Sequence, residues 1–449
     1  MPLDLNTTLS DLVALASVNP MGRNVAAPEF FEWRVTDYVE KLLARFQIPH
    51  CRQPIAPLQD NLLSCVFGDV PPGAGGELLL FDVHQDTVGV EGMTIPPWTP
   101  TVRDGRLYGR GSCDVKGGLA VMLGALVRLA EERASGRSSA AGPRPTVVLA
   151  CTVNEEHGFS GAKGVCRIWS DTSSQAAPQP GAKPIPPAVL KFLPRRPDAA
   201  VVAEPTELKI VVAHKGMIRW RCHAHGRAAH SSNPGLGDNA IYRMAPVVSL
   251  LERYSQEVLP TLGEHPLCGR RTLSVGTIAG GSGVNTVPDR CTIEIDHRLL
   301  PGDDPRAAWQ RTVDYVSAGL RARRQATANS EPDRDARAGA ALIEHEEPLM
   351  HSSGLSDAAN GALAGRLSSI LRGAIAGGER IGVPFGTNAA IISAAGVPTV
   401  VFGPGSIAQA HTADEWIQLD QLPLASEAIF HLMRLGLRSQ ASSTDVEGR

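Results

Sequence analysis

Apolar runs that end in polar residues dominate the first half of the chain. Residues 77–88, 146–158 and 199–207 each begin as a nearly continuous apolar run and close with polar residues that include acids. Such runs are typical of buried strands that open into a loop. Residues 116–136 are apolar on most faces, which predicts a buried helix. Strands that alternate with helices indicate an α/β sheet, and such sheets bind ligands just beyond their strand ends.

The pattern changes near residue 210, where several stretches alternate apolar and polar residues. Helical spacing returns around residues 238–257 and 305–324. The resulting order, strand–helix–strand–strand–helix–strand, is typical of a ferredoxin-like α+β domain. Residues 394–406 then return to the buried-strand pattern of the first half. A chain of 449 residues is also too long for one ordinary core, so two domains are expected.

We therefore predict an α/β catalytic domain that is interrupted by a second domain. The catalytic domain would contain a mixed, mostly parallel sheet flanked by helices, and would consist of residues 1–211 and 348–449. The inserted α+β domain of ferredoxin-like type would span residues 212–347. A segment rich in proline, alanine and serine, residues 170–197, is predicted to be an irregular surface insertion in the first part.

Composition and charge narrow the possible functions. The net charge of −3 comes without a long basic stretch, which argues against a nucleic-acid groove or a membrane-surface patch. The N-terminal sequence lacks the features of a signal peptide, and no run of about 18 apolar residues predicts a membrane span. The cysteines are scattered without a C-x-x-C pair, which indicates reduced thiols and a cytoplasmic protein. A metal site would therefore depend on carboxylates and histidines.

Acids and histidines gather at the ends of the predicted strands and in the loops that follow. They are His84, Asp86, Asp114, Glu155, Glu156, Glu204 and His411. Taken alone, each has an ordinary alternative: Asp114 could cap the next helix, and Glu155 and Glu156 could face solvent in a turn. Together they supply histidines and carboxylates without a thiolate, which suits zinc, cobalt or manganese. The set is large enough for a two-metal site with one bridging carboxylate.

Seven motifs resemble those of one zinc-dependent family, which contains acetylornithine deacetylase, succinyl-diaminopimelate desuccinylase and glutamate carboxypeptidase. In the family's order, they are FDVHQDTV, GRLYGRGSCDVKGG, TVNEEHG, AEPTELKIVVAHKG, RAAHSSNP, SGVNTVPDRCTIEIDHRLLP and FGPGSIAQAHTADE. They span most of the chain between about residues 80 and 418. The segment 170–197 and the extreme C-terminus lie outside the resemblance.

The resemblance implies a role for each candidate residue in a two-metal site. The implied assignments are Asp114 as the bridge between two ions, His84 and Glu204 as further ligands of one ion, Glu156 and His411 as further ligands of the other, Glu155 as the general base, and Asp86 as the residue that orients His84. None of these positions is lost, which argues against a non-catalytic relative that only binds a metal or a ligand.

The resemblance also implies that the inserted domain serves as a lid or a dimerisation domain. His230 would reach the active site of a partner subunit and stabilise the oxyanion there. Asn285 and Arg298 would contact the substrate, with Arg298 as a candidate for its carboxylate; the alternative for Arg298 is a salt bridge on the strand surface. Asn388 departs from the family pattern, because many relatives carry an aspartate there, and this leaves the specificity near that loop open.

We therefore expect an enzyme that hydrolyses the amide bond of an N-acyl amino acid, with an acetylornithine deacetylase as the best match. It would use two divalent ions, zinc or else cobalt or manganese, and act as a cytoplasmic homodimer. It would bind a small N-acyl amino acid or a short peptide as its substrate, and it would bind neither nucleic acid nor a membrane. The alternatives within the family are a desuccinylase and a dipeptidase or carboxypeptidase with the same metals.

Overall fold

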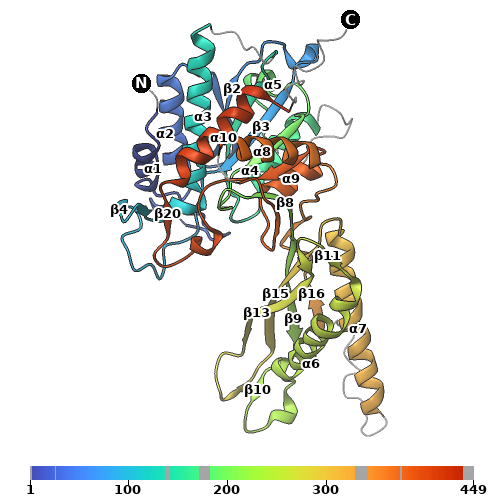
Figure 1. The fold of residues 1–449 in the computed structure, drawn as a ribbon. Coiled ribbons are helices and arrows are strands. Elements are labelled where there is room, and N and C mark those ends of the chain that lie inside the picture. The colour runs from blue at the N-terminus through green and yellow to red at the C-terminus, as the bar shows by residue number, and fades with distance from the viewer. Residues whose placement is uncertain are drawn as a thin grey trace, which may run out of the picture. The chain divides into compact units, whose positions relative to one another are not determined.

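In a computed structural model, the chain forms two compact units (Figure 1). Unit 1 falls within Met1–Val212, Ser356–Ile381 and Thr387–Arg449, and unit 2 within Ala213–Leu355 and Gly382–Gly386. The structure describes residues 3–25, 27–136, 142–170, 183–328, 342–374 and 377–437. Unit 2 therefore extends past residue 347, where the sequence placed its end, and takes in a short second segment that the sequence did not indicate.

Unit 1 is built on a mixed sheet, as predicted, and this sheet has eight strands. Their order is β1-β2-β6-β3-β7-β19-β8-β18. The strands are β1 (His50–Ala56), β2 (Gln59–Val66), β3 (Leu78–His84), β6 (Thr146–Thr152), β7 (Ala199–Val202), β8 (Ile210–His214), β18 (Arg380–Val383) and β19 (Thr399–Val401). The four neighbours β6, β3, β7 and β19 pair in parallel. The β1–β2, β2–β6 and β19–β8 pairs are antiparallel.

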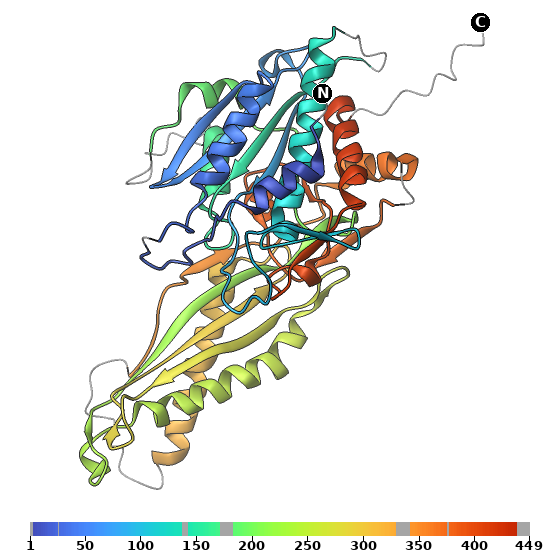
Figure 2. The same ribbon diagram turned by 90° about the vertical axis from the view of Figure 1, so that its left-hand side faces the viewer.

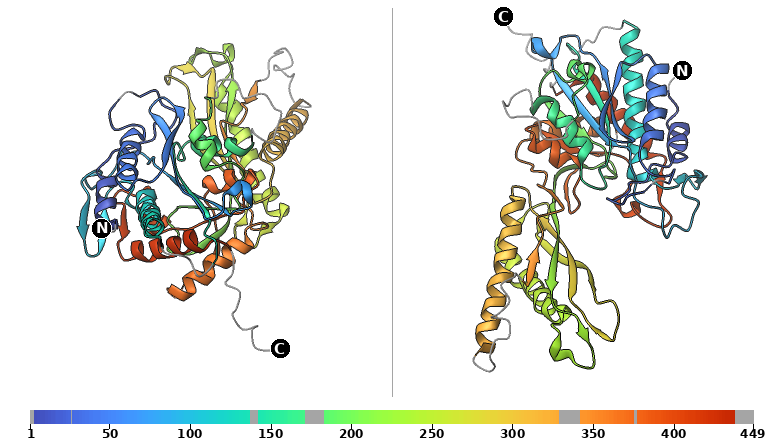
Figure 3. Two further views of the ribbon diagram at one scale, coloured as in Figure 1. Left: turned by 90° about the horizontal axis from the view of Figure 1, so that it is seen from above. Right: turned by 180° about the vertical axis from the view of Figure 1, so that it is seen from behind.

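Helices cover both faces of this sheet (Figure 3). One face carries α1 (Leu5–Val13), α2 (Trp33–Arg45), α3 (Gly117–Ala134), α8 (Gly361–Ala374) and α10 (Gln421–Leu435), whose apolar residues share one core with the strands. The other carries α4 (Ser160–Ser170), α5 (Pro187–Phe192) and α9 (Asn388–Ala394). Helix α3 is buried along most of its length, which explains why its sequence is apolar nearly all round.

The predicted irregular segment 170–197 is only partly described by the structure. Residues 171–182 lie outside the described residues. Residues 187–192 form helix α5, so the prediction of irregular structure is wrong there. Val189 and Phe192 are buried, and the Phe192 ring meets Phe67 edge-on with ring centroids 6.1 Å apart. This apolar contact stabilises the short helix. Helix propensity alone did not predict the helix, because the surrounding sequence is rich in proline.

Unit 2 has the ferredoxin-like order of elements that the sequence predicted. They are β9 (Gly216–His225), α6 (Ala240–Arg253), β13 (Thr272–Gly280), β15 (Arg290–Leu299), α7 (Pro305–Ala328) and β16 (Ile343–His345). The sheet order is β13-β15-β9-β16, with antiparallel pairs throughout, and β17 (Met350–Ser352) also pairs with β9. Figure 2 shows the long strands of this sheet with α6 beside them. Residues such as Ile218, Trp220 and Met244 form its core.

The remaining strands form small sheets. In unit 1, β4 (Thr101–Arg103), β5 (Arg106–Tyr108) and β20 (Trp416–Gln418) make a three-stranded sheet in the order β20-β5-β4. In unit 2, β10 (Ala229–His230) pairs with β14 (Thr286–Val287), and β11 (Glu264–His265) pairs with β12 (Gly269–Arg270). No helix among the described residues is both long and apolar enough to cross a membrane.

Candidate metal centre

The register of the central strands brings four strand ends to one edge of the unit 1 sheet. His84, the last residue of β3, pairs with Thr152 at the end of β6. On the other side of β3, Asp82 pairs with Val202 at the end of β7, and Val202 pairs with Val401 at the end of β19. The loops that follow therefore start side by side, and these loops carry the candidate residues.

The ring of His84 is fixed by its own loop. Its Nδ1 lies 3.0 Å from the backbone carbonyl oxygen of Asp86. Since a carbonyl oxygen can only accept, Nδ1 carries the ring proton and donates a hydrogen bond to this oxygen. Its Nε2 then faces Asp114 Oδ1 at 3.2 Å and Glu204 Oε1 at 3.9 Å. A ring nitrogen lone pair and two carboxylate oxygens that converge in this way form the donor set of a zinc-like cation.

Asp114 is shared between two such groups. Its Oδ1 faces His84, whereas its Oδ2 lies 3.4 Å from His411 Nε2. The same His411 nitrogen lies 3.4 Å from Glu156 Oε1. In each group, His84–Asp114–Glu204 and Asp114–Glu156–His411, the ligand atoms lie within 4.8 Å of one another. The residues thus fit two divalent cations, with Asp114 able to bridge them.

Asp86 is buried and holds the backbone of the next loop. Its carboxylate accepts hydrogen bonds from the backbone N–H of Glu155 at 3.1 Å and of Glu156 at 3.0 Å. It also accepts one from Asn19 Nδ2 at 2.8 Å, and its Oδ1 lies 3.5 Å from His84 Nδ1. The prediction had Asp86 orient His84 through its carboxylate, whereas the shorter contact to the ring comes from the Asp86 carbonyl.

Glu155 is buried beside these groups but belongs to neither of them. Burial is the main reason that its pKa lies well above the usual value for a glutamate, and the negative charge of Glu156 raises it further. A buried carboxyl group that is free of ligand contacts and prone to take up a proton has the properties of a general base.

The clustered carboxylates raise the proton affinity of the groups around them. Burial and the neighbouring Asp114 raise the pKa of Glu156 and hold that of Glu204 well above its usual range. The contacts with Asp114 and Glu156 raise the pKa of His411 to about 10. Each shift means that the cluster of carboxylates attracts protons, as it would attract metal cations.

Sequence reasoning missed two residues that shape this site, Asn19 and Glu415. Asn19 bonds to the Asp86 carboxylate, and its position in the N-terminal segment gave no signal. Glu415 accepts a hydrogen bond from the backbone N–H of Asp114 at 3.0 Å. It lies four residues after His411 in the same motif, so its place beside a candidate ligand was the available signal.

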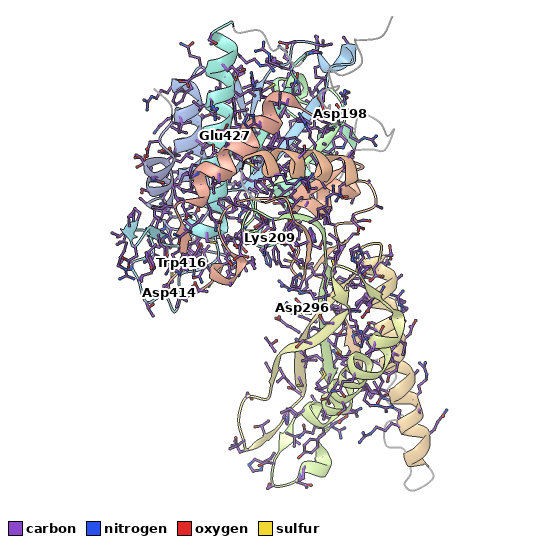
Figure 4. The ribbon with its side chains drawn as sticks, in the orientation of Figure 1. Asp198, Lys209, Asp296, Asp414, Trp416 and Glu427 are labelled. Atoms are coloured by element: carbon purple, nitrogen blue, oxygen red, sulfur yellow. The ribbon has the colours of Figure 1, made fainter. Side chains whose placement is uncertain are left out.

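The three remaining candidates lie in unit 2. His230 is exposed, and its Nδ1 accepts a hydrogen bond from the backbone N–H of Ser232 at 3.1 Å, which leaves the ring proton on Nε2 as a donor. The backbone carbonyl of Asn285 accepts a hydrogen bond from Ser231 at 3.0 Å, so Asn285 lies next to His230. Arg298 donates through Nε to Asp296 Oδ1 at 2.7 Å, the salt bridge that was its alternative; Figure 4 labels Asp296.

The side chain of Asn388 makes its hydrogen bonds with residues that are not candidate ligands. It is buried in unit 1, where its Nδ2 donates to Asp82 Oδ1 at 2.9 Å and to Thr152 Oγ1 at 3.1 Å. An aspartate here would put a second carboxylate against Asp82 in a low-dielectric interior. The neutral amide therefore serves as a hydrogen-bond donor to Asp82.

The sequence profile of Peptidase family M20/M25/M40 matches residues 80–435. The chain belongs to this family. It is also 28% identical to acetylornithine deacetylase from Myxococcus xanthus over 351 residues, which is 78% of each protein. These findings confirm the predicted relationship and the hydrolase class.

Solved structures of M20 proteins share the fold. A tripeptidase from Staphylococcus aureus superposes with a TM-score of 0.68 at 20% identity, over 97% of this chain and 98% of that one. An M20 family metallo-carboxypeptidase from Sulfolobus solfataricus superposes with a TM-score of 0.65 at 16% identity, over 96% of this chain and 99% of that one. At these identities the likeness concerns the fold.

We predict that the metal-free protein loses thermal stability as the pH rises from 6.5 towards 10. The pKa of His411 is raised from about 6.5 in the unfolded chain to about 10, so its stabilising contacts are complete below pH 6.5 and disappear as it deprotonates. The raised pKa of Glu204 acts in the same direction, because its ionisation in the folded state is unfavourable.

Thermal unfolding of the chelator-treated protein between pH 6 and 9.5 tests this prediction. Added Mn²⁺ or Zn²⁺ should raise the melting temperature and flatten the slope, because cations replace the protons. At 100 times the dissociation constant, binding adds about 2.7 kcal/mol. The matched variant His411→Gln should show a smaller slope without metal. A melting temperature that is constant over this pH range, with and without metal, would contradict the interpretation.

Proposed function

We propose that the protein hydrolyses the amide bond of an N-acyl amino acid with two divalent metal ions, as an acetylornithine deacetylase does. The observation that carries the proposal is the position of Asp114, whose two carboxylate oxygens face two different histidines. The Myxococcus xanthus relative supports the choice of substrate by its name. Zinc is the first choice of metal, with cobalt and manganese as alternatives, since all three suit carboxylate and imidazole ligands.

The proposed ligands follow the two groups of the site. His84, Asp114 and Glu204 would hold one ion, and Asp114, Glu156 and His411 the other. Asp86 keeps the backbone of the Glu155–Glu156 loop in place. The fixed Nδ1 proton of His84 sets the tautomer, which leaves Nε2 as the ligand atom.

Glu155 is the proposed general base. When bound, the ions supply Lewis acidity to the scissile carbonyl and to the attacking water. Glu155 takes a proton from that water at its carboxylate and later gives it to the departing amine nitrogen. Because burial raises the pKa of Glu155, the carboxyl can hold the proton between the two steps. His230, with its proton on Nε2, would donate a hydrogen bond to the oxyanion.

The first test is metal-dependent release of an amine from a substrate panel. The panel holds N-acetyl-ornithine, N-succinyl-diaminopimelate, other N-acetyl amino acids and short peptides, because the structural relatives include peptidases. We expect hydrolysis of N-acetyl-ornithine that disappears with chelator and returns with Zn²⁺ or Co²⁺. Preference for the succinyl compound or for peptides would replace the substrate assignment. No metal-dependent release from any member would contradict the proposed activity.

The control for this assay is Glu155→Gln. It keeps the size of the side chain and both ligand groups but removes the proton acceptor. Turnover should fall by about 10²–10⁴-fold, while two metal ions per chain remain bound. Turnover near the wild-type value in this variant would exclude Glu155 as the base, even if the substrate assignment were correct.

Arg298 is proposed to bind the substrate carboxylate. It shares Asp296 with Arg219, whose Nε lies 2.7 Å from Asp296 Oδ2, so the two arginines have similar contacts on one carboxylate. Arg298→Met should raise KM for carboxylate substrates by about 10–100-fold with little change in kcat, because a charge-assisted bond is worth about 1.5–3 kcal/mol. Arg219→Met is the matched control and should leave KM unchanged. Equal effects of both variants would indicate a structural role only.

Unit 2 is proposed to form a homodimer interface and to supply His230 to a partner subunit. Exposed apolar side chains gather on this unit around a groove of about 1280 Å³. They include Ile241, Tyr242 and Val284, and Tyr242 is 77% exposed. In addition, β13 is an edge strand that pairs only with β15 among the described residues, so its outer edge can pair with another strand.

Light scattering tests the dimer. We expect twice the chain mass of 47.6 kDa for the wild type. Tyr242→Asp should give a monomer that still binds metal but has lost activity, whereas Leu58→Asp on unit 1 should remain a dimer. A fully active monomer would rule out a role for the partner's His230.

The location proposed for the protein is the cytoplasm, supported by eight free cysteines, and cell fractionation would test it.

A further inference from the structure

Glu415 is a buried carboxylate whose hydrogen bonds all go to one loop. Its Oε1 accepts from the backbone N–H of Cys113 at 2.9 Å and of Asp114 at 3.0 Å. Its Oε2 accepts from the backbone N–H of Gly111 at 2.9 Å and from Arg110 Nη1 at 2.8 Å. Four donors occupy the four acceptor positions of the carboxylate, so it has no oxygen lone pair left for a metal or a substrate.

Three backbone N–H groups of this loop, those of Gly111, Cys113 and Asp114, donate to Glu415. Gly109 and Gly111 have φ angles of 147° and 80°, which residues that carry a side chain rarely adopt. Asp114 has φ −120° and ψ 92°, outside the helical region, although α3 begins three residues later. Without an acceptor, each of these buried N–H groups would be left unpaired, which destabilises the folded chain.

Glu415 also connects this loop to two other parts of the site. It lies four residues after His411, between Asp414 and Trp416, which are labelled in Figure 4. Its partner Arg110 donates through Nε to the carbonyl of Gly89 at 3.0 Å, in the segment that continues from His84 and Asp86. One carboxylate thus ties together the segments that carry Asp114, His411 and His84.

We propose that Glu415 is a positioning residue, which orients the Asp114 carboxylate so that its two oxygens can serve two metal ions. The bond to the Asp114 N–H fixes the backbone from which that side chain projects. The bond to Gly111 fixes the start of the loop. The proposal rests on the proposed two-metal function, since it gives Asp114 the bridging role.

Glu415→Gln is the decisive variant. The amide has the same shape, but its NH₂ group must face either the Gly111–Arg110 donors or the Cys113–Asp114 donors. Two donors would then point at each other in a buried position, and the loop must shift. Substitutions of residues that support metal ligands typically weaken binding by about 10–100-fold. We expect such a loss for at least one ion.

The measurement is calorimetric titration of the metal-free, full-length protein with Zn²⁺, together with the visible absorption spectrum of the Co²⁺-loaded protein. Glu415→Gln should weaken binding and change the spectrum, because the ligand geometry changes. The matched control is Asp303→Asn in unit 2. Asp303 also binds an arginine, Arg271, and a backbone N–H, that of Leu300. The Asp303→Asn variant should lose some thermal stability and keep the metal affinity of the wild type.

The outcomes separate this inference from the proposed function. A wild type that binds fewer than two ions would overturn both. A wild type with two ions and a Glu415→Gln variant with the same affinities and the same Co²⁺ spectrum would overturn the positioning role alone. If Glu415→Gln does not fold, Arg110→Met decides the question, because it removes one of the four donors and keeps the backbone bonds. It should weaken metal binding several-fold, and unchanged binding in that variant would also overturn the inference.

Discussion

The concentration of buried carboxylates at one edge of the unit 1 sheet is the constraint on which the rest of this structure depends. The buried acids are Asp86, Asp114, Glu155, Glu204 and Glu415, and the half-buried Glu156 lies beside them. Like charges in a buried site raise the free energy of the folded chain unless protons, hydrogen-bond donors or cations compensate them. Burial and the neighbouring Asp114 hold the pKa of Glu204 well above its usual range, and Asp114 and Glu156 raise that of His411.

The fold divides these acids into two kinds. Asp86 and Glu415 accept backbone N–H groups and arginine or asparagine donors, so their charges are satisfied inside the protein. Asp114, Glu156 and Glu204 instead face histidine nitrogens and converge on two positions. The first kind makes the second possible, because a loop with fixed backbone can hold a carboxylate where it would otherwise be repelled. The proposed metal positions therefore depend on the loops as much as on the ligands.

Unit 2 is organised by different forces. Its sheet buries one face against α6 and α7 and leaves the other face to paired charges such as Arg219, Asp296 and Arg298. The exposed apolar residues near α6 are unusual for a surface of this kind, and they are the reason to assign association to this unit. The candidate metal ligands therefore lie in unit 1, whereas the proposed association surface lies in unit 2.

The sequence by itself determined the candidate ligands and the order of elements in both units. The signal was local: apolar runs such as residues 78–84 form buried strands, and the acids or histidines that follow must lie at the strand ends. Only the tertiary structure decided that Glu415 holds the Asp114 loop and that Asn388 pairs with Asp82. These partners are 301 and 306 residues apart in the chain, and no periodicity or spacing connects them. A hydrogen bond between distant segments depends on where packing places each backbone, which a local pattern does not encode.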